Sequence, residues 1–361
     1  MQNNAYLVLE NGSVFCGNGF GYDGEAIGEL VFTTSMTGYM ETLTDPGYYG
    51  QIVTQTFPLI GNYGFISEDC ESDKPYLKAY VVRDWCQHPS NFRCEGLLDT
   101  FLKDNKVVGL YGIDTRELTK LLREHGSMKA KITASIDNID KIVSELKAYK
   151  LTDCVKSVTC ENEQTYSAED KKYRVVLWDF GTVKNTIKEL TKRGCEVIRV
   201  GANTTAKRIL ELAPDGVLLS NGPGDPTENK EIIAEIKKVL DKKIPTFGIC
   251  LGHLMMALSQ GAKSYKLGCG HHGANQPALN TKTGSVYITS QNHNYAILED
   301  TLPSNARVSF KNVNDGSCEG IEYTDMPAFS IQFYPNECGG PLNPGALFDD
   351  FIDLLNLGGG K

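Results

Sequence analysis

The segment Gly248-Ile249-Cys250-Leu251-Gly252 constrains the fold more than any other part of this chain. An apolar run ends just before the cysteine and a helical pattern begins just after it. The two glycines allow a sharp strand-to-helix turn, which is the cysteine counterpart of the nucleophile elbow. Such a turn exposes the sulfur above the carboxyl edge of a sheet, where the helix N-terminus favours a thiolate and the Leu251 N–H can bind an oxyanion. The alternative is a buried cysteine that only packs.

Strands and helices alternate around this turn. We expect strands at residues 173–180, 195–200, 216–220 and 244–249, each followed by a helix, at 184–193, 205–212, 228–240 and 251–260. This alternation implies right-handed crossovers and a parallel sheet that is covered on both faces. Later strands at 286–289, 306–310 and 328–333 and a closing helix at 345–356 complete an α/β domain with a mostly parallel open sheet.

The first 150 residues form a different, β-rich α/β pattern. Strands at 5–9 and 14–16 flank Asn11-Gly12, a strong hairpin signal, and 28–34 is a further strand. Residues 37–64 are expected to form loops and short strands. A capping box at Asp114–Glu117 predicts a helix that Gly126 ends, and 139–149 is another helix. Polar residues 151–172 indicate a linker, so we expect domains at 1–150 and 173–361.

Composition narrows the class of protein. The chain has 361 residues, and its net charge of -9 argues against nucleic acid or an anionic membrane as the main partner. Neither a membrane-spanning run nor a signal peptide is evident, which predicts a cytoplasmic protein with 11 reduced cysteines. Cys269, His271 and His272 cluster without a fourth metal ligand, so we expect a glycine-rich loop there and no metal site.

A second tight loop accompanies the cysteine turn. Ser220–Pro226 contains two glycines and two prolines and follows an expected strand. Ligands in open α/β sheets bind at the carboxyl ends of strands, so this loop is expected to form a second wall of the same pocket. The alternative is a strand-to-helix turn that binds nothing.

Several motifs resemble the class I glutamine amidotransferase family. They are Phe247–His253, Ser220–Pro226 and Ser290-Gln291-Asn292-His293. Motifs in the first domain narrow the resemblance to the small subunit of carbamoyl-phosphate synthase. These are Thr37-Gly38-Tyr39, Leu43-Thr44-Asp45-Pro46, Gln51-Ile52-Val53, Ile60-Gly61-Asn62 and Ile113-Asp114-Thr115-Arg116.

The resemblance implies a function and a partner. In this family a cysteine attacks the side-chain amide of glutamine, a histidine transfers protons and a glutamate orients the histidine. The released ammonia passes to a large subunit that uses ATP, magnesium and bicarbonate, so the first domain is expected to form the large-subunit interface. No cofactor is expected in this chain itself. The nucleophile corresponds to Cys250, the oxyanion contacts to Gly222 and Leu251, and substrate contacts to Gly224, Asn292 and Tyr295.

The chain departs from the family pattern at this one pocket. Tyr334 occupies the histidine position and Asn336 the glutamate position, although Glu337 is adjacent. The remaining departures are at substrate contacts. Leu254 replaces a glutamine, Asn294 a glycine and Gly47 a serine.

Tyrosine is a poor base at neutral pH, so we expect the ordinary glutaminase activity to be weak or absent. Three interpretations remain open. The chain is a small subunit with a structural or gating role, or its pocket is remodelled so that Cys250 acts on another amide or acyl compound. In the third, it is a working glutaminase with an unusual proton path.

Overall fold

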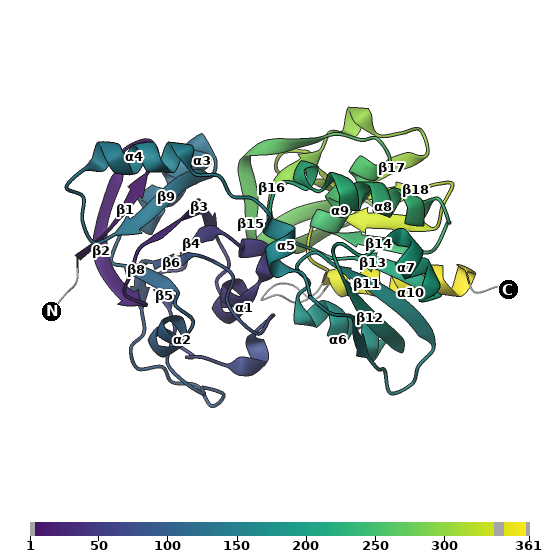
Figure 1. The fold of residues 1–361 in the computed structure, drawn as a ribbon, viewed down its shortest axis with the longest axis horizontal. Coiled ribbons are helices and arrows are strands. Elements are labelled where there is room, and N and C mark those ends of the chain that lie inside the picture. The colour runs from purple at the N-terminus through teal and green to yellow at the C-terminus, as the bar shows by residue number, and fades with distance from the viewer. Residues whose placement is uncertain (1–3, 336–342, 359–361) are drawn as a thin grey trace. The chain divides into compact units, whose positions relative to one another are not determined.

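The computed structural model describes residues 4–335 and 343–358. The chain divides into two compact units, shown in Figure 1. Unit 1 comprises residues 1–154 together with 268–273, and unit 2 comprises 155–267 and 274–361. The segment 268–273 thus groups with the first unit, although the sequence placed it within the second domain. Among the described residues, no helix is both long and apolar enough to cross a membrane.

Unit 1 is built on a closed barrel whose strands follow the order β1-β2-β8-β6-β4-β3-β9. The strands are β1 (Asn4–Leu9), β2 (Val14–Gly21), β3 (Ala26–Thr33), β4 (Gln51–Gln55), β6 (Ala79–Val82), β8 (Val108–Tyr111) and β9 (Met128–Thr133). Neighbours from β3 through β4 and β6 to β8 run parallel, and the other pairings are antiparallel. Side chains alternate between two clusters, with Leu30 in one and Val31 in the other, as the period of a strand requires.

Short helices cover this barrel. They are α1 (Tyr39–Thr44), α2 (Leu98–Asp104), α3 (Thr115–His125) and α4 (Ile139–Ala148), and a small sheet pairs β5 (Leu59–Ile60) with β7 (Asp84–Trp85). The predicted start of α3 is confirmed, because the Asp114 carboxylate accepts hydrogen bonds from the N–H groups of Arg116 and Glu117. Gly126 ends the helix with φ 82. The helix α1 lies where we expected only loops and short strands.

Unit 2 contains a ten-stranded sheet in the order β10-β12-β11-β13-β14-β19-β18-β16-β15-β17. Five central strands are parallel: β12 (Cys195–Gly201), β11 (Tyr173–Asp179), β13 (Gly216–Leu219), β14 (Thr246–Ile249) and β19 (Ala328–Ile331). At the β19 edge the sheet continues in antiparallel strands β18 (Cys318–Tyr323), β16 (Val286–Ile297), β15 (Ser264–Asn280) and β17 (Ala306–Asn312). The predicted α/β fold is confirmed, with the parallel part confined to the centre.

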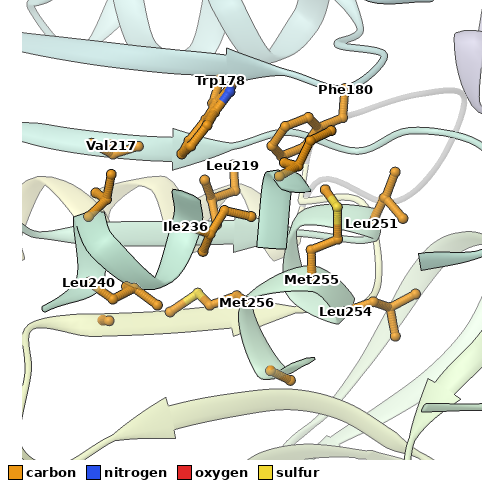
Figure 2. Close-up of a cluster of buried hydrophobic side chains, with 14 of the residues drawn as sticks. Trp178, Phe180, Val217, Leu219, Ile236, Leu240, Leu251, Leu254, Met255 and Met256 are labelled. Atoms are coloured by element: carbon orange, nitrogen blue, oxygen red, sulfur yellow. The ribbon is translucent and has the colours of Figure 1, made fainter. Parts of the chain in front are cut away.

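Helices cover both faces of the parallel strands. Trp178 and Leu219 face a cluster that contains α7 (Ala206–Glu211), α8 (Lys230–Leu240) and α9 (Leu251–Ser259), part of which is shown in Figure 2. Leu177 and Leu218 face the opposite way, toward α6 (Lys184–Lys192) and α10 (Ala346–Gly358). Continuous apolar runs are needed because each parallel strand is buried on both sides.

Two segments differ from the sequence-based expectation. Residues 151–172 are not a bare linker, because they contain α5 (Cys154–Val158) and β10 (Gln164–Tyr166). Val155 and Val158 are buried at helical spacing, and β10 pairs with β12 at the edge of the sheet. The expected glycine-rich loop around Cys269 is instead part of the long strand β15. Short or polar segments carry little periodic signal, so α5, β10 and this part of β15 were missed.

Candidate active site at Cys250

Cys250 lies at the turn between β14 and α9 and has a strained backbone. Its φ is 51 and its ψ is -105, a backbone conformation that residues other than glycine rarely adopt. The Cys250 N–H donates to the Ile331 carbonyl over 2.8 Å, which ties the turn to β19. The predicted strand-to-helix turn is therefore present, but the predicted exposure of the sulfur is wrong, because Cys250 is only 2% exposed. Strain of this kind costs about 1–3 kcal/mol and is concentrated at functional sites.

The glycines of the motif are needed for close packing. A Cβ on Gly252 would lie 2.3 Å from the Leu219 carbonyl oxygen, and one on Gly248 would lie 3.1 Å from the Gly252 carbonyl oxygen. Neither glycine has a positive φ, so the requirement is space and not conformation. The first turn of α9 can thus pack directly on β13.

The loop after β13 lies against the elbow. The Gly252 N–H donates to the Ser220 carbonyl over 3.0 Å. A Cβ on Gly222 would lie 2.2 Å from the Phe180 carbonyl oxygen, and Gly224 has φ 92, so both positions require glycine. Gly222 and Gly224 thus lie in a loop that packs beside the Cys250 turn, and this loop was predicted to form the second wall of the pocket.

A buried carboxylate, which the sequence analysis missed, fixes the segment under this loop. Asp179 Oδ1 accepts from the N–H groups of Gly181 and Thr182 over 3.0 and 2.7 Å. Its Oδ2 accepts from the Cys160 N–H and pairs with Arg199, each over 2.7 Å. Asp179 is fully buried, so its charge needs these partners. An acidic residue at the end of an apolar strand was the available signal.

The sulfur of Cys250 contacts one residue that directly follows the parallel strand β19 and one residue of the antiparallel strand β16. The Gln332 side-chain amide lies 3.6 Å from Sγ, and the Asn292 carbonyl oxygen lies 3.8 Å from it. The Tyr334 N–H donates to the Ser290 carbonyl over 2.9 Å, so Tyr334 lies beside β16. The structure thus brings Cys250 close to Asn292, and the backbone of the buried Tyr334 pairs with the same strand two residues before Asn292. Gln332 lies in the predicted strand 328–333, but it was not predicted as a site residue.

Two histidines of unit 2 are engaged in structural hydrogen bonds. His253 is fully buried, and its Nδ1 lies 2.8 Å from Ser330 Oγ. Burial lowers the pKa of His253 to about 3, so its ring is neutral at physiological pH. His293 uses Nδ1 toward the Tyr295 carbonyl at 2.9 Å and Nε2 toward Gln291 Oε1 at 3.1 Å.

The other predicted site residues are dispersed. Leu251 and Leu254 are buried in the cluster between α9 and the sheet, where Figure 2 shows them with Met255 and Phe180. Asn294 and Tyr295 lie on β16, and Asn294 is buried.

The last two predicted site residues are Gly47 and Asn336. Gly47 belongs to unit 1, where its N–H donates to Asp45 Oδ1 over 2.8 Å. Asn336 lies outside the described residues.

Two family models and several curated proteins match this chain. Residues 7–132 match the family described as carbamoyl-phosphate synthase small chain, CPSase domain, and residues 176–354 match glutamine amidotransferase class-I. Carbamoyl phosphate synthase small chains from Clostridium perfringens and Fusobacterium nucleatum are each 48% identical. The first match covers 96% of this chain and 98% of that protein, and the second covers 98% of each. A solved glutamine amidotransferase from Thermotoga maritima covers 51% of this chain and 84% of its own, at 20% identity and a TM-score of 0.38.

Proposed function

The chain belongs to the carbamoyl-phosphate synthase small chain family, and on that premise we propose that it pairs with a large ATP-dependent subunit while hydrolysing glutamine weakly or not at all. The large subunit would bind ATP, magnesium and bicarbonate, and this chain would need no cofactor. Free ammonia would then replace glutamine as the nitrogen source, and the small chain would keep a structural or gating role.

The observation that carries this proposal is the buried Tyr334 at the position where the family pattern has its histidine, with its N–H bonded to Ser290 of β16. Attack by a thiol on an amide needs a base that takes the thiol proton and returns it to the leaving nitrogen. The reference pKa of tyrosine is about 10 and that of histidine about 6.5, so a phenol is protonated when an imidazole would accept a proton. Losing such a base costs roughly three to six powers of ten in rate.

Neither His253 nor His293 offers a ready replacement. His253 is held against Ser330 in a fully buried position that keeps its ring neutral. Both ring nitrogens of His293 are engaged, with Tyr295 and with Gln291. Recruiting His293 would break its hydrogen bonds inside the protein, at a cost of about 1–3 kcal/mol for each group left unsatisfied. The pKa of His253, lowered by burial to about 3, makes its ring a weak base at neutral pH.

The position of Leu254 adds a second obstacle. Its side chain packs in the apolar cluster of α9, where the family pattern has a glutamine that contacts substrate. A substrate polar group that loses its partner in a buried site costs about 1–3 kcal/mol of binding free energy. We therefore expect glutamine to bind this chain more weakly as well.

A second candidate function is a remodelled pocket in which Cys250 attacks a different amide or acyl compound. The retained strain at Cys250 favours it, because a cysteine that no longer reacts has no need for φ 51. The amide of Gln332 beside the sulfur is also compatible with a stabilised thiolate.

Ammonia release from glutamine, measured with and without the large subunit, tests the proposal. The variant Tyr334→His/Asn336→Glu serves as the comparison, and a Cys250→Ala version of that variant serves as the control. Weak release by the natural chain and a large gain in the variant that needs Cys250 are expected. Ordinary turnover by the natural chain would contradict the proposal, whereas labelling of Cys250 by acyl electrophiles without glutamine turnover would favour the second candidate.

A further inference from the structure

A cavity of about 610 Å³ in unit 1 lies beside α3, far along the chain from Cys250. Its size is within the range of small-molecule sites. The side chains that matter here are Thr34, Thr56 and Arg83 from three loops, and Arg116, Lys120 and Arg123 from α3. All of them belong to unit 1.

The cavity is placed where parallel strands end. Thr34 directly follows β3, Thr56 follows β4 and Arg83 follows β6, while Asp114 lies three residues after the end of β8. These four strands are parallel neighbours in the barrel, so their carboxyl ends lie on the same rim. Ligand sites of α/β proteins are built on loops at that end of the strands.

The charge of the lining is strongly positive. Four cationic side chains face one carboxylate, that of Asp114, which leaves a formal charge of +3. The Asp114 carboxylate is already occupied as the cap of α3, and the N–H groups of Glu117 and Arg116 lower its pKa. The chain as a whole carries -9, so this pocket opposes the overall charge.

The arginines of the pocket differ from every other arginine in the chain. Six of the nine arginines form ion pairs with acidic side chains. They are Arg93, Arg174, Arg193, Arg199, Arg208 and Arg307. Within the part of the chain that the structure describes, the three arginines without an ion pair are Arg83, Arg116 and Arg123. All three line this cavity, and Lys120 beside them is likewise unpaired among the described residues.

The arrangement on α3 is unfavourable without an anion. Arg116, Lys120 and Arg123 follow one another at spacings of four and three residues, so they share one face of the helix. Like charges at this spacing repel each other. Arg116 also lies in the first turn, where the helix dipole disfavours a cation. A bound anion would remove both penalties.

We propose that this pocket binds a small organic anion that carries at least two phosphate or carboxylate groups. Guanidinium groups form paired hydrogen bonds with both kinds of group. The inference goes beyond the proposed function and does not depend on it, because the pocket lies in unit 1 and can be tested on this chain without glutamine.

Calorimetric titration of the whole chain with pyrophosphate and with citrate, at two salt concentrations, tests the proposal and separates the two chemical classes. The variant Arg116→Gln/Lys120→Gln removes two of the cations. The variant Lys141→Gln/Lys150→Gln removes the same charge from exposed positions of unit 1 outside the pocket. We expect saturable binding of one anion, a loss of at least about tenfold in affinity in the pocket variant, and no change in the control.

Three outcomes would overturn the proposal. The first is that neither anion gives saturable binding, and the second is that both double variants lose affinity equally, which would indicate only general charge attraction. In the third, neither anion binds but the pocket variant weakens association with the large subunit, which identifies the surface as a protein interface. Thermal unfolding of both variants confirms that they are folded, and glutamine hydrolysis is a separate readout that bears only on the proposed function.

Discussion

The side-chain amide of Gln332 donates a hydrogen bond to the sulfur of Cys250 across 3.6 Å. Gln332 is fully buried and is held in place by its own N–H, which donates to the Glu319 carbonyl over 2.8 Å. A fixed donor at this distance favours the thiolate over the thiol. The nucleophile is thus supported by a residue two positions before Tyr334.

Replacing this amide should make Cys250 less reactive. In Gln332→Met the side chain keeps its length but loses the donor, so we expect alkylation by iodoacetamide near neutral pH to slow by roughly three- to tenfold. The rate is measured by mass spectrometry of the Cys250 peptide over a range of pH. Gln260→Met, at the end of α9, is the control and should leave the rate unchanged. Equal rates in Gln332→Met and the natural chain would show that the contact does not stabilise the thiolate.

The ion pair between Asp179 and Arg199 should contribute strongly to the stability of the segment that packs against the Gly222 loop. Asp179→Asn keeps an oxygen for the N–H groups of Gly181 and Thr182 but removes the charge that Arg199 faces. We expect the free energy of unfolding in urea to fall by about 3 kcal/mol, because breaking a buried pair leaves an uncompensated charge.

The matched control for Asp179→Asn is Glu163→Gln. This variant breaks the ion pair between Glu163 and Arg208, whose side chains are 41% and 45% exposed, respectively. The loss of unfolding free energy should therefore stay below about 1 kcal/mol. Similar losses in the two variants would contradict a special role for the buried carboxylate.

The sequence predicted the parallel core and the elbow because both depend on local signals. Val175–Trp178 is apolar without interruption, as a strand buried on both faces must be, and Gly248 and Gly252 bracket a cysteine. The capping of α3 by Asp114 is local in the same way. The sequence therefore predicted the turn at Cys250 and the parallel strands around it, but not the order of those strands in the sheet.

The remaining parts depend on contacts between distant segments. β15 contains three glycines and a proline and shows no regular apolar alternation, and its identity as a strand comes from its partners in the sheet. Asp179 and Gln332 matter because of Arg199 and Cys250, which lie 20 and 82 residues away. The basic pocket of unit 1 collects residues from four strand ends, which only the closed barrel brings together.

His253 should make the stability of the protein depend on pH. Its folded-state pKa of about 3 lies below the ordinary value of 6.5, so the unfolded chain binds a proton first as the pH falls. The contribution of the neutral His253 ring to the free energy of unfolding is therefore complete above pH 6.5, and it decreases as the pH falls from 6.5 toward 3. Between pH 7 and pH 5 the loss should be roughly 2 kcal/mol.

Comparing pH profiles isolates this contribution. His253→Asn retains a group that can bond Ser330 and should show a shallower fall in the free energy of unfolding between pH 7 and pH 5 than the natural chain. His125→Asn, at the exposed end of α3, should follow the natural profile. A His253→Asn profile parallel to that of the natural chain would mean that the ring is protonated in the folded state.

The strain at Cys250 predicts an unusual order of stability between two small replacements. At φ 51 and ψ -105 an alanine keeps the steric conflict of Cβ, whereas a glycine relieves it. We expect Cys250→Gly to be more stable than Cys250→Ala by about 1–2 kcal/mol in urea unfolding.

Cys195 provides the matched comparison, because it is equally buried but lies in the regular strand β12 without a positive φ. There the order should reverse, with Ala more stable than Gly by about 0.5–1 kcal/mol. The same order at both positions would mean that Cys250 is not strained. A reversed order would show that the chain still maintains nucleophile geometry at a measurable cost in stability, even with tyrosine in the position of the base.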